Sequence, residues 1–215
     1  AQTSILFLHQ SVGQDLEDGA EKNGFKFAYF GPSQTTVDPG PNGGIFTDVG
    51  NVGNGDARQK FDVVRRVVAG LNGRAKIISV KLGYADVQTE SLETVKTEYQ
   101  RLVTELQAGG LRFVHVTPPL VYSVAENPPK VKLRQWMLAT FPRDVIFDLQ
   151  DVESLDAGQR CEEGGVWRIC QENRSTPTCP SKGQGVDEDG AGHLCEAKAA
   201  VFSKAMLYAY YLAAR

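Results

Sequence analysis

Residues 75–119 read AKIISVKLGYADVQTESLETVKTEYQRLVTELQAGGLRFVHVTPP, and this stretch decides the fold class. Ala75–Leu82 is a short apolar run typical of a buried strand. Ser91–Ala108 carries apolar residues at helical spacing, namely Leu92, Val95, Tyr99, Leu102 and Leu106. Arg112–Val116 is a second apolar run, and the Thr-Pro-Pro that follows it ends the strand. Because two strands joined by a helix pair in parallel through a right-handed crossover, the stretch predicts an open α/β sheet.

The same alternation of strand and helix extends in both directions from this stretch. Further strands are expected at Ile5–Leu8, Phe25–Phe30 and Val145–Leu149, and further helices at Ser11–Lys22, Ala57–Ala69, Val131–Phe141 and His193–Ala214. The sequence therefore predicts a three-layer α/β/α architecture around a five-stranded, mainly parallel sheet. We expect a single domain over residues 1–215, with an irregular, cysteine-bearing insertion at about 155–192.

Composition excludes several classes of function. The 215 residues are 41% hydrophobic and 23% charged, with 26 acidic and 23 basic side chains, so there is no basic footprint for nucleic acid. No apolar run approaches the roughly 20 residues of a membrane-spanning helix. The chain begins Ala-Gln-Thr without Met, as a secreted protein does after loss of its signal peptide, and as any trimmed chain would.

The four cysteines all lie in the last part of the chain, at Cys161, Cys170, Cys179 and Cys195. Zinc sites usually bring two ligands within two to four residues of each other, and these spacings do not. Two disulfides are therefore predicted, with three pairings open, ahead of buried free thiols or a metal site. Disulfides indicate an oxidising compartment, so a secreted or periplasmic location is expected.

Open parallel sheets place their sites beyond the carboxyl ends of the strands. Ser11 follows the first predicted strand and begins a helix, so its hydroxyl and its backbone N–H would both lie at that edge. A serine nucleophile needs a base, and the alternative is that Ser11 only caps the helix.

Of the three histidines, His193 is the candidate base. It follows an acidic, glycine-containing stretch in which Asp189, or alternatively Asp187, could fix its tautomer; the alternative is an ordinary surface histidine. His9 lies near the same edge and is a candidate substrate-binding residue, with a supporting or structural role as the alternative. His115 lies inside a strand and is expected in the core.

The long segment from residue 31 to 56 is too rich in Gly and Pro for an idle connection. Within it, Gly53, Asn54 and Gly55 offer backbone and amide donors for an oxyanion, or form an ordinary flexible loop. No phosphate-binding motif is present. A sugar-binding cleft is a further hypothesis for the aromatic residues Tyr84, Tyr122, Trp136 and Trp167, which could equally be ordinary core and surface residues.

In order along the chain, these features resemble the blocks of the SGNH hydrolase superfamily, the GDSL-like esterases and acylhydrolases. The first block, His9-Gln10-Ser11-Val12-Gly13, is similar to a secreted bacterial branch that has His-x-Ser-Val-Gly. The resemblance implies a flavodoxin-like sheet, Ser11 as nucleophile, His193 as base and Asp189 as its carboxylate. It also implies an oxyanion hole from the Ser11 N–H, a glycine N–H (Gly53 or Gly55) and an Asn side chain.

Two positions depart from the family pattern. The third block, Gly-x-Asn-Asp in the family, has Ala85 in place of Asn, so Asn54 becomes the candidate amide donor. Asp189 stands four residues before His193 instead of three. The resulting prediction is a secreted serine esterase for short acyl groups such as acetyl, for example on a polysaccharide, with no cofactor and no metal. The alternatives are acyl transfer to a sugar acceptor and a degraded module that binds a glycan or a partner.

Overall fold

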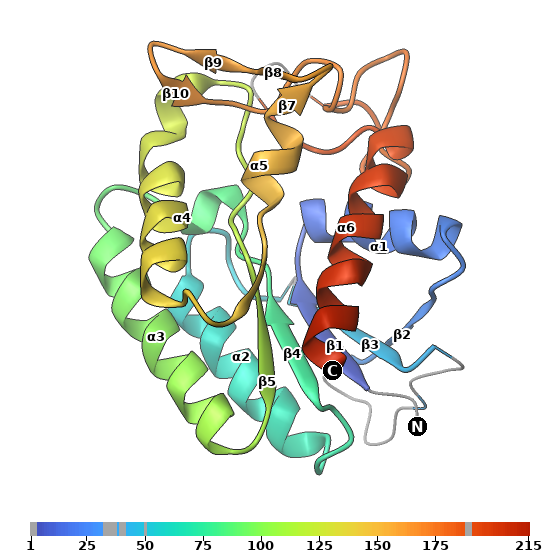
Figure 1. Cartoon of the computed structure of the whole chain (residues 1–215), viewed down its shortest axis with the longest axis vertical. Helices are drawn as coiled ribbons and strands as arrows, with labels where there is room; N and C mark the ends of the chain where they lie inside the picture. The colour runs from blue at the N-terminus through green and yellow to red at the C-terminus, as the bar shows by residue number, and fades with distance from the viewer. Residues whose placement is uncertain (1–3, 32–37, 39–41, 50, 188–190) are drawn as a thin grey trace.

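The computed structural model describes residues 4–31, 38, 42–49, 51–187 and 191–215. At its centre is a sheet of six parallel strands in the order β2-β3-β1-β4-β5-β6 (Figure 1). The strands are β1 (Ile5–His9), β2 (Phe27–Tyr29), β3 (Gly44–Asp48), β4 (Ile77–Val80), β5 (Arg112–Val116) and β6 (Val145–Phe147). Side chains of β1 are buried on both faces, as expected of a central strand covered by helices on each side.

Helices cover both faces of the sheet (Figure 1). One face carries α1 (Val12–Lys22) and α6 (Glu196–Ala214), and the other carries α2 (Ala57–Gly70), α3 (Leu92–Ala108) and α4 (Pro128–Thr140). Each face has its own apolar core, one around Phe61 and Tyr99 and one around Phe7 and Met206. The predicted three-layer α/β/α fold is therefore confirmed.

The predicted strand count of five is wrong, because the sheet has a sixth strand inside the long Gly- and Pro-rich segment. Strand β3 lies between β1 and β2 and pairs in parallel with both, with Phe7 opposite Phe46. Its sequence, GIFTD, has no long apolar run, and only its place between two strands buries Ile45 completely. Tertiary pairing, which local composition does not reveal, makes this segment a strand.

Several element boundaries also differ from the prediction. Helix α4 begins at Pro128 and not at Val131, because proline fits the first turn of a helix. Residues from Leu149 leave the sixth strand and form the short helix α5 (Leu149–Glu153), capped by Asp148. Helix α6 begins at Glu196, so His193 lies in the loop before it.

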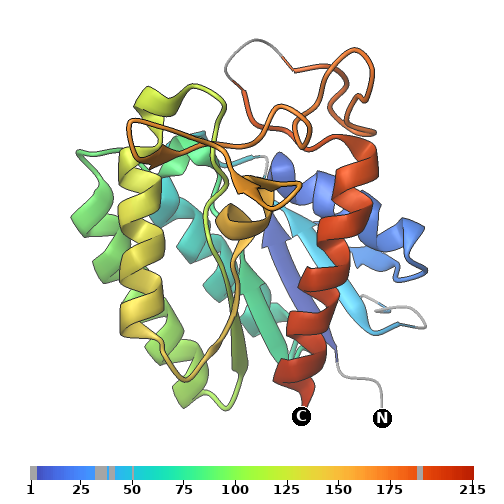
Figure 2. The same cartoon turned by 45° about the horizontal axis from the view of Figure 1, so that its top comes forward.

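The cysteine-bearing segment lies across the end of the sheet at which the strands finish (Figure 2). It contains four two-residue strands in two hairpins: β7 (Leu155–Asp156) with β8 (Gln159–Arg160), and β9 (Glu162–Glu163) with β10 (Val166–Trp167). The predicted disulfides are present, and they pair Cys161 with Cys170 and Cys179 with Cys195. Among the described residues, no helix is long and apolar enough to cross a bilayer.

Helices α1 and α6 pack closely, and this contact joins the start of the chain to its end. A Cβ on Gly19 would lie 2.2 Å from the Ala199 carbonyl oxygen, so only glycine allows this approach. Beside it, the Asn23 side-chain amide donates to the Ala200 carbonyl at 2.7 Å. The helix that begins after Ser11 is thereby fixed to the helix that follows His193.

Candidate active site

Ser11 stands at the turn between β1 and α1 in a backbone conformation unusual for a residue with a side chain. Its φ is 59° and its ψ is −116°, a sparsely populated region that costs on the order of 1–3 kcal/mol and recurs at functional sites. Its hydroxyl makes no capping hydrogen bond to α1. Instead, Ser11 Oγ lies 3.0 Å from His193 Nε2. The simple helix-cap alternative therefore does not describe this serine.

A buried lysine supports the turn that carries Ser11. Lys81, at the end of β4, is 1% exposed and donates from Nζ to the Gln10 carbonyl at 2.7 Å. Burial lowers the pKa of Lys81 to about 7. The carbonyl group immediately before Ser11 is thus held by the side chain of the residue that follows the neighbouring strand.

His193 is held by its own backbone as well as by its ring. Its N–H donates to Asp187 Oδ2 at 2.6 Å, and its carbonyl accepts from the Ser175 N–H at 2.7 Å. Two residues on, Cys195 ties the loop to Cys179 through a disulfide. These contacts fix the imidazole position although His193 belongs to no helix or strand.

The carboxylate beside His193 comes from α1 and not from the acidic loop. Asp15 Oδ2 lies 3.2 Å from His193 Nδ1 and also accepts the Leu194 N–H at 2.9 Å, and its other oxygen accepts the Ser181 hydroxyl. Since an ionised carboxylate can only accept, Nδ1 carries the proton and Nε2 presents its lone pair to Ser11. The side chains of Ser11, His193 and Asp15 thus form one hydrogen-bonded chain.

Asp189, the predicted carboxylate, lies outside the described residues, and Asp187 binds the His193 backbone and not the ring. The sequence does not single out Asp15, because the strand-end rule selects residues before α1 and the acid–His pattern selects acids close to His193. A signal was present nonetheless: Asp15 lies one turn after Ser11, on the face of α1 that also carries the buried Val12 and Leu16. An acid on an apolar helix face needs a partner, and here the partner is His193.

The predicted oxyanion loop is attached to the turn that follows β4, because the Gly55 N–H donates to Asp86 Oδ1 at 3.0 Å. In this structure the Gly55 N–H therefore already has an acceptor. Asp86 also binds Lys60 Nζ at 2.6 and 2.7 Å, in a fully buried ion pair. Gly53 and Asn54 are exposed at the tip of the loop.

His9 does not present its ring to the site. It is 1% exposed and stacks on Phe46, with 5.3 Å between ring centroids, so its inclusion among substrate-binding residues is corrected to a buried structural role. Burial lowers its pKa to about 3. His115 is in the core as predicted, bound to the Tyr99 hydroxyl and to Asp144 at 3.0 Å each.

The four aromatic side chains proposed for a sugar cleft separate into two groups. Trp136 packs in the core against Tyr99, and two guanidinium groups, those of Arg134 and Arg160, cover Trp167. Only Tyr84 and Tyr122 line a pocket beside the site. The cleft expected from sequence therefore loses both tryptophans.

This pocket has a volume of about 680 Å³. Tyr84 lines it and also meets the His193 ring edge-on, with 6.4 Å between ring centroids, which connects the pocket to the hydrogen-bonded chain. Its other polar lining residues are Tyr122, Ser123, Glu126, Glu163 and Arg168, beside apolar residues such as Val121 and Val124. A mixed lining of phenols, charges and apolar side chains is typical of pockets that hold small molecules.

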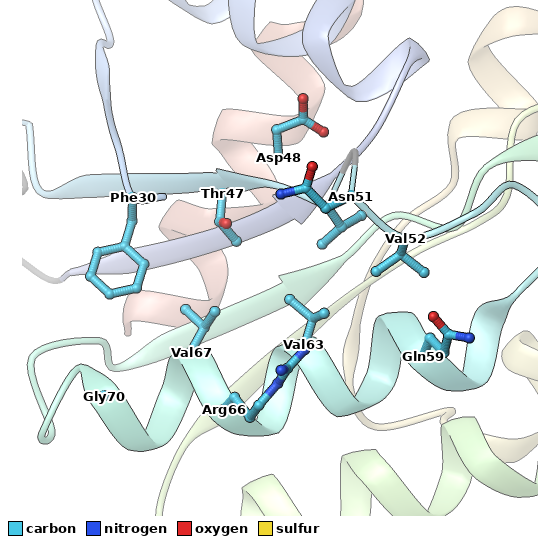
Figure 3. Close-up of a pocket in the computed structure, with 11 residues that line it drawn as sticks. Phe30, Thr47, Asp48, Asn51, Val52, Gln59, Val63, Arg66, Val67 and Gly70 are labelled. Carbon is cyan, nitrogen blue, oxygen red and sulfur yellow. The ribbon is translucent and has the colours of Figure 1, made fainter. Parts of the chain in front are cut away.

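A second pocket of about 390 Å³ lies along α2, on the face of the sheet that α2 covers (Figure 3). Val52, Val63 and Val67 give it an apolar wall, and Arg66 and Asp48 lie at its margin. Ser11, His193 and Asp15 do not line it, so it is separate from the hydrogen-bonded chain described above. Within the described residues, no three His, Cys, Asp or Glu side chains are grouped as metal ligands would be.

Comparison with solved structures identifies the fold. A protein of Desulfitobacterium hafniense DCB-2 assigned to the G-D-S-L family of lipolytic proteins superposes with a TM-score of 0.59 at 10% identity, over 96% of this chain and 99% of its own. A Streptococcus pneumonia protein assigned as a platelet activating factor gives 0.54 at 14% identity, over 98% and 85%. No family model and no curated protein matches the sequence. The chain therefore shares its α/β fold with these two proteins.

Proposed function

We propose that this protein is a serine esterase that hydrolyses short-chain acyl esters through an acyl-enzyme. The observation that carries the proposal is the continuous hydrogen-bonded chain from Ser11 Oγ through His193 to Asp15. Nucleophile, base and orienting carboxylate are the three roles that serine hydrolysis needs, and they recur on unrelated folds in this geometry. The G-D-S-L assignment of a structural neighbour adds independent support.

The reaction follows from this geometry. Ser11 Oγ attacks the ester carbonyl while its proton moves to His193 Nε2, and Asp15 stabilises the imidazolium. The alcohol leaves with the proton from Nε2, which yields an acyl-Ser11. Water then attacks the acyl group, its proton passes to Nε2, and release of the acid restores the Ser11 hydroxyl. The backbone N–H groups of Ser11 and Gly53 are the proposed oxyanion donors.

The polar side chains in the pocket that Tyr84 lines support a substrate whose alcohol part carries hydroxyl groups, such as an acetylated carbohydrate. Its lining mixes the phenols of Tyr84 and Tyr122 with the charged side chains of Glu126 and Arg168. The second pocket, with its apolar valines, is not lined by any residue of the hydrogen-bonded chain, which favours short acyl groups over long ones. The two disulfides favour a secreted or periplasmic protein.

The test is turnover of p-nitrophenyl acetate and butyrate by the wild-type protein and by Ser11→Ala. Loss of the nucleophile is expected to reduce kcat by about 10⁴- to 10⁶-fold, as in other serine hydrolases. Ser123→Ala, which removes a hydroxyl from the pocket but not from the hydrogen-bonded chain, is the matched comparison and should act mainly through KM. Equal turnover by wild type and Ser11→Ala would end the proposal.

A binding module with a degraded site is the second candidate, and the observation in its favour is the missing amide at Ala85. It predicts binding of acetylated oligosaccharides without turnover. It also predicts that an organophosphonate leaves Ser11 unlabelled. Labelling of Ser11 together with hydrolysis would exclude this candidate.

A further inference from the structure

Tyr84 lies in the turn where the family pattern has an asparagine and this chain has Ala85. It is the first residue of the short 3₁₀ turn η1 (Tyr84–Asp86), immediately before Ala85. Its ring meets the His193 ring edge-on, at 88°, with 6.4 Å between ring centroids, and its phenol interacts with the Ser11 side chain. One tyrosine therefore lies beside both the candidate nucleophile and the candidate base.

The turn that carries Tyr84 is fixed from both sides by one buried carboxylate. Asp86 Oδ2 accepts the Gly83 N–H at 2.7 Å, which closes the turn on itself. Asp86 Oδ1 accepts the Gly55 N–H from the neighbouring loop, and Lys60 neutralises the carboxylate. The phenol and the Gly53–Gly55 loop are thus attached to the same anchor, so their relative position is set before any substrate arrives.

We propose that the Tyr84 hydroxyl donates a hydrogen bond to the oxyanion that forms when Ser11 attacks an ester, in place of the amide that Ala85 lacks. The proposal rests on the serine esterase function proposed above. The Tyr84 ring lies against the imidazole that binds Ser11 Oγ, so its hydroxyl is placed near the carbonyl that this oxygen attacks, and a tyrosine hydroxyl is a suitable oxyanion donor. As negative charge develops on the carbonyl oxygen, the phenol donates its hydrogen bond to that oxygen.

The two donors considered from sequence fit this role less well. The Gly55 N–H is already bound to Asp86. The side chain of Asn54 is exposed at the loop tip, where water competes for its amide, whereas Tyr84 is half-buried. Burial also raises the pKa of Tyr84 above its usual value, so the phenol keeps its proton at neutral pH.

The decisive variant is Tyr84→Phe, because it removes the hydroxyl but keeps the ring against His193. We expect kcat for p-nitrophenyl acetate to fall by about 10²-fold or more, the usual effect of one lost oxyanion donor, with KM changed by less than about twofold. Affinity for a boronic acid, which forms a tetrahedral adduct with Ser11, should fall by a similar factor. Tyr208→Phe, an exposed position on α6, should leave all three quantities near wild type, and Asn54→Ala should lose less kcat than Tyr84→Phe.

Several results would overturn the assignment. A Tyr84→Phe enzyme with kcat within about threefold of wild type has no need of the hydroxyl, and a rise in KM alone would make Tyr84 a substrate-binding residue. A loss of kcat that disappears with better leaving groups would place the hydrogen bond on the leaving oxygen. A larger loss in Asn54→Ala would return the role to Asn54. Full turnover by Ser11→Ala, in contrast, would remove the serine mechanism itself.

Discussion

The two regions that supply the candidate active site are stabilised by different interactions. Ser11 follows β1, whose five residues are all buried, and α1 packs on α6 through Gly19. His193 belongs to a segment with two-residue strands, two disulfides and fully buried polar side chains such as Asn173 and Ser175. Apolar burial positions Ser11, whereas covalent bonds and side chain-to-backbone hydrogen bonds position His193. A loop can therefore be as ordered as a helix where such contacts replace the core.

Asp15 joins the two regions, so changing it should have the largest effect on activity after loss of the nucleophile. Asp15→Asn keeps the shape of the side chain but favours the wrong tautomer of His193, and kcat should fall by about 10⁴-fold. Asp187→Asn weakens only a contact to the His193 backbone and should reduce kcat by less than about 100-fold. Steady-state kinetics on both variants, with circular dichroism to verify folding, make the comparison. A larger loss in Asp187→Asn would reverse the assignment of the carboxylate.

The disulfides test whether the second region depends on covalent bonds. Replacing Cys179 and Cys195 by serine opens a loop of sequence separation 16 and should lower the free energy of unfolding by about 2–4 kcal/mol. Activity should fall with it, because Cys195 is two residues from His193. The matched double variant at Cys161 and Cys170 should lose stability but retain more activity. Urea unfolding and kinetics measure both quantities, and equal activity losses in the two variants would count against a role in positioning His193.

The smallest expected effect concerns His9 in β1 and the pH dependence of the free energy of unfolding. Burial lowers the pKa of His9 from 6.5 to about 3, so the unfolded chain takes up a proton below pH 6.5 that the folded chain refuses. Stability from this group is complete above pH 6.5 and is lost as the pH falls toward 3. His9→Phe, which keeps a ring against Phe46, should therefore remove this rise, so that the slope of the free energy of unfolding against pH becomes less positive between pH 3 and 6.5.

Glu17 provides a control, because its contribution to stability changes with pH in the opposite direction to that of His9. Burial raises its pKa to about 7, so the folded chain holds a proton that the unfolded chain releases above pH 4.5, and stability from this group is lost as the pH rises toward 7. Glu17→Gln should therefore steepen the loss of stability on the acid side. Urea unfolding between pH 4 and 7 measures both slopes, and an unchanged slope in His9→Phe would contradict the account of His9.

Sequence patterns were sufficient for the layers of the fold and for two of the three residues in the hydrogen-bonded chain. Periodicity identifies α3, and the strand-end rule selects Ser11, because both depend on local pattern alone. Strand β3 was missed because its burial comes from neighbours far along the chain. Asp15 was missed for the same reason: its partner, His193, is 178 residues away. The disulfide pairing likewise depends on distances that spacing does not encode.

The central claim is that Ser11 Oγ is made nucleophilic by His193, which Asp15 holds in place. Its most direct test is treatment with a p-nitrophenyl alkylphosphonate, followed by intact mass measurement and peptide mapping. The account predicts one covalent adduct, on Ser11, that forms at least about 100-fold more slowly in Asp15→Asn and is absent in His193→Ala. An unmodified wild-type protein, or an adduct on another residue, would contradict it.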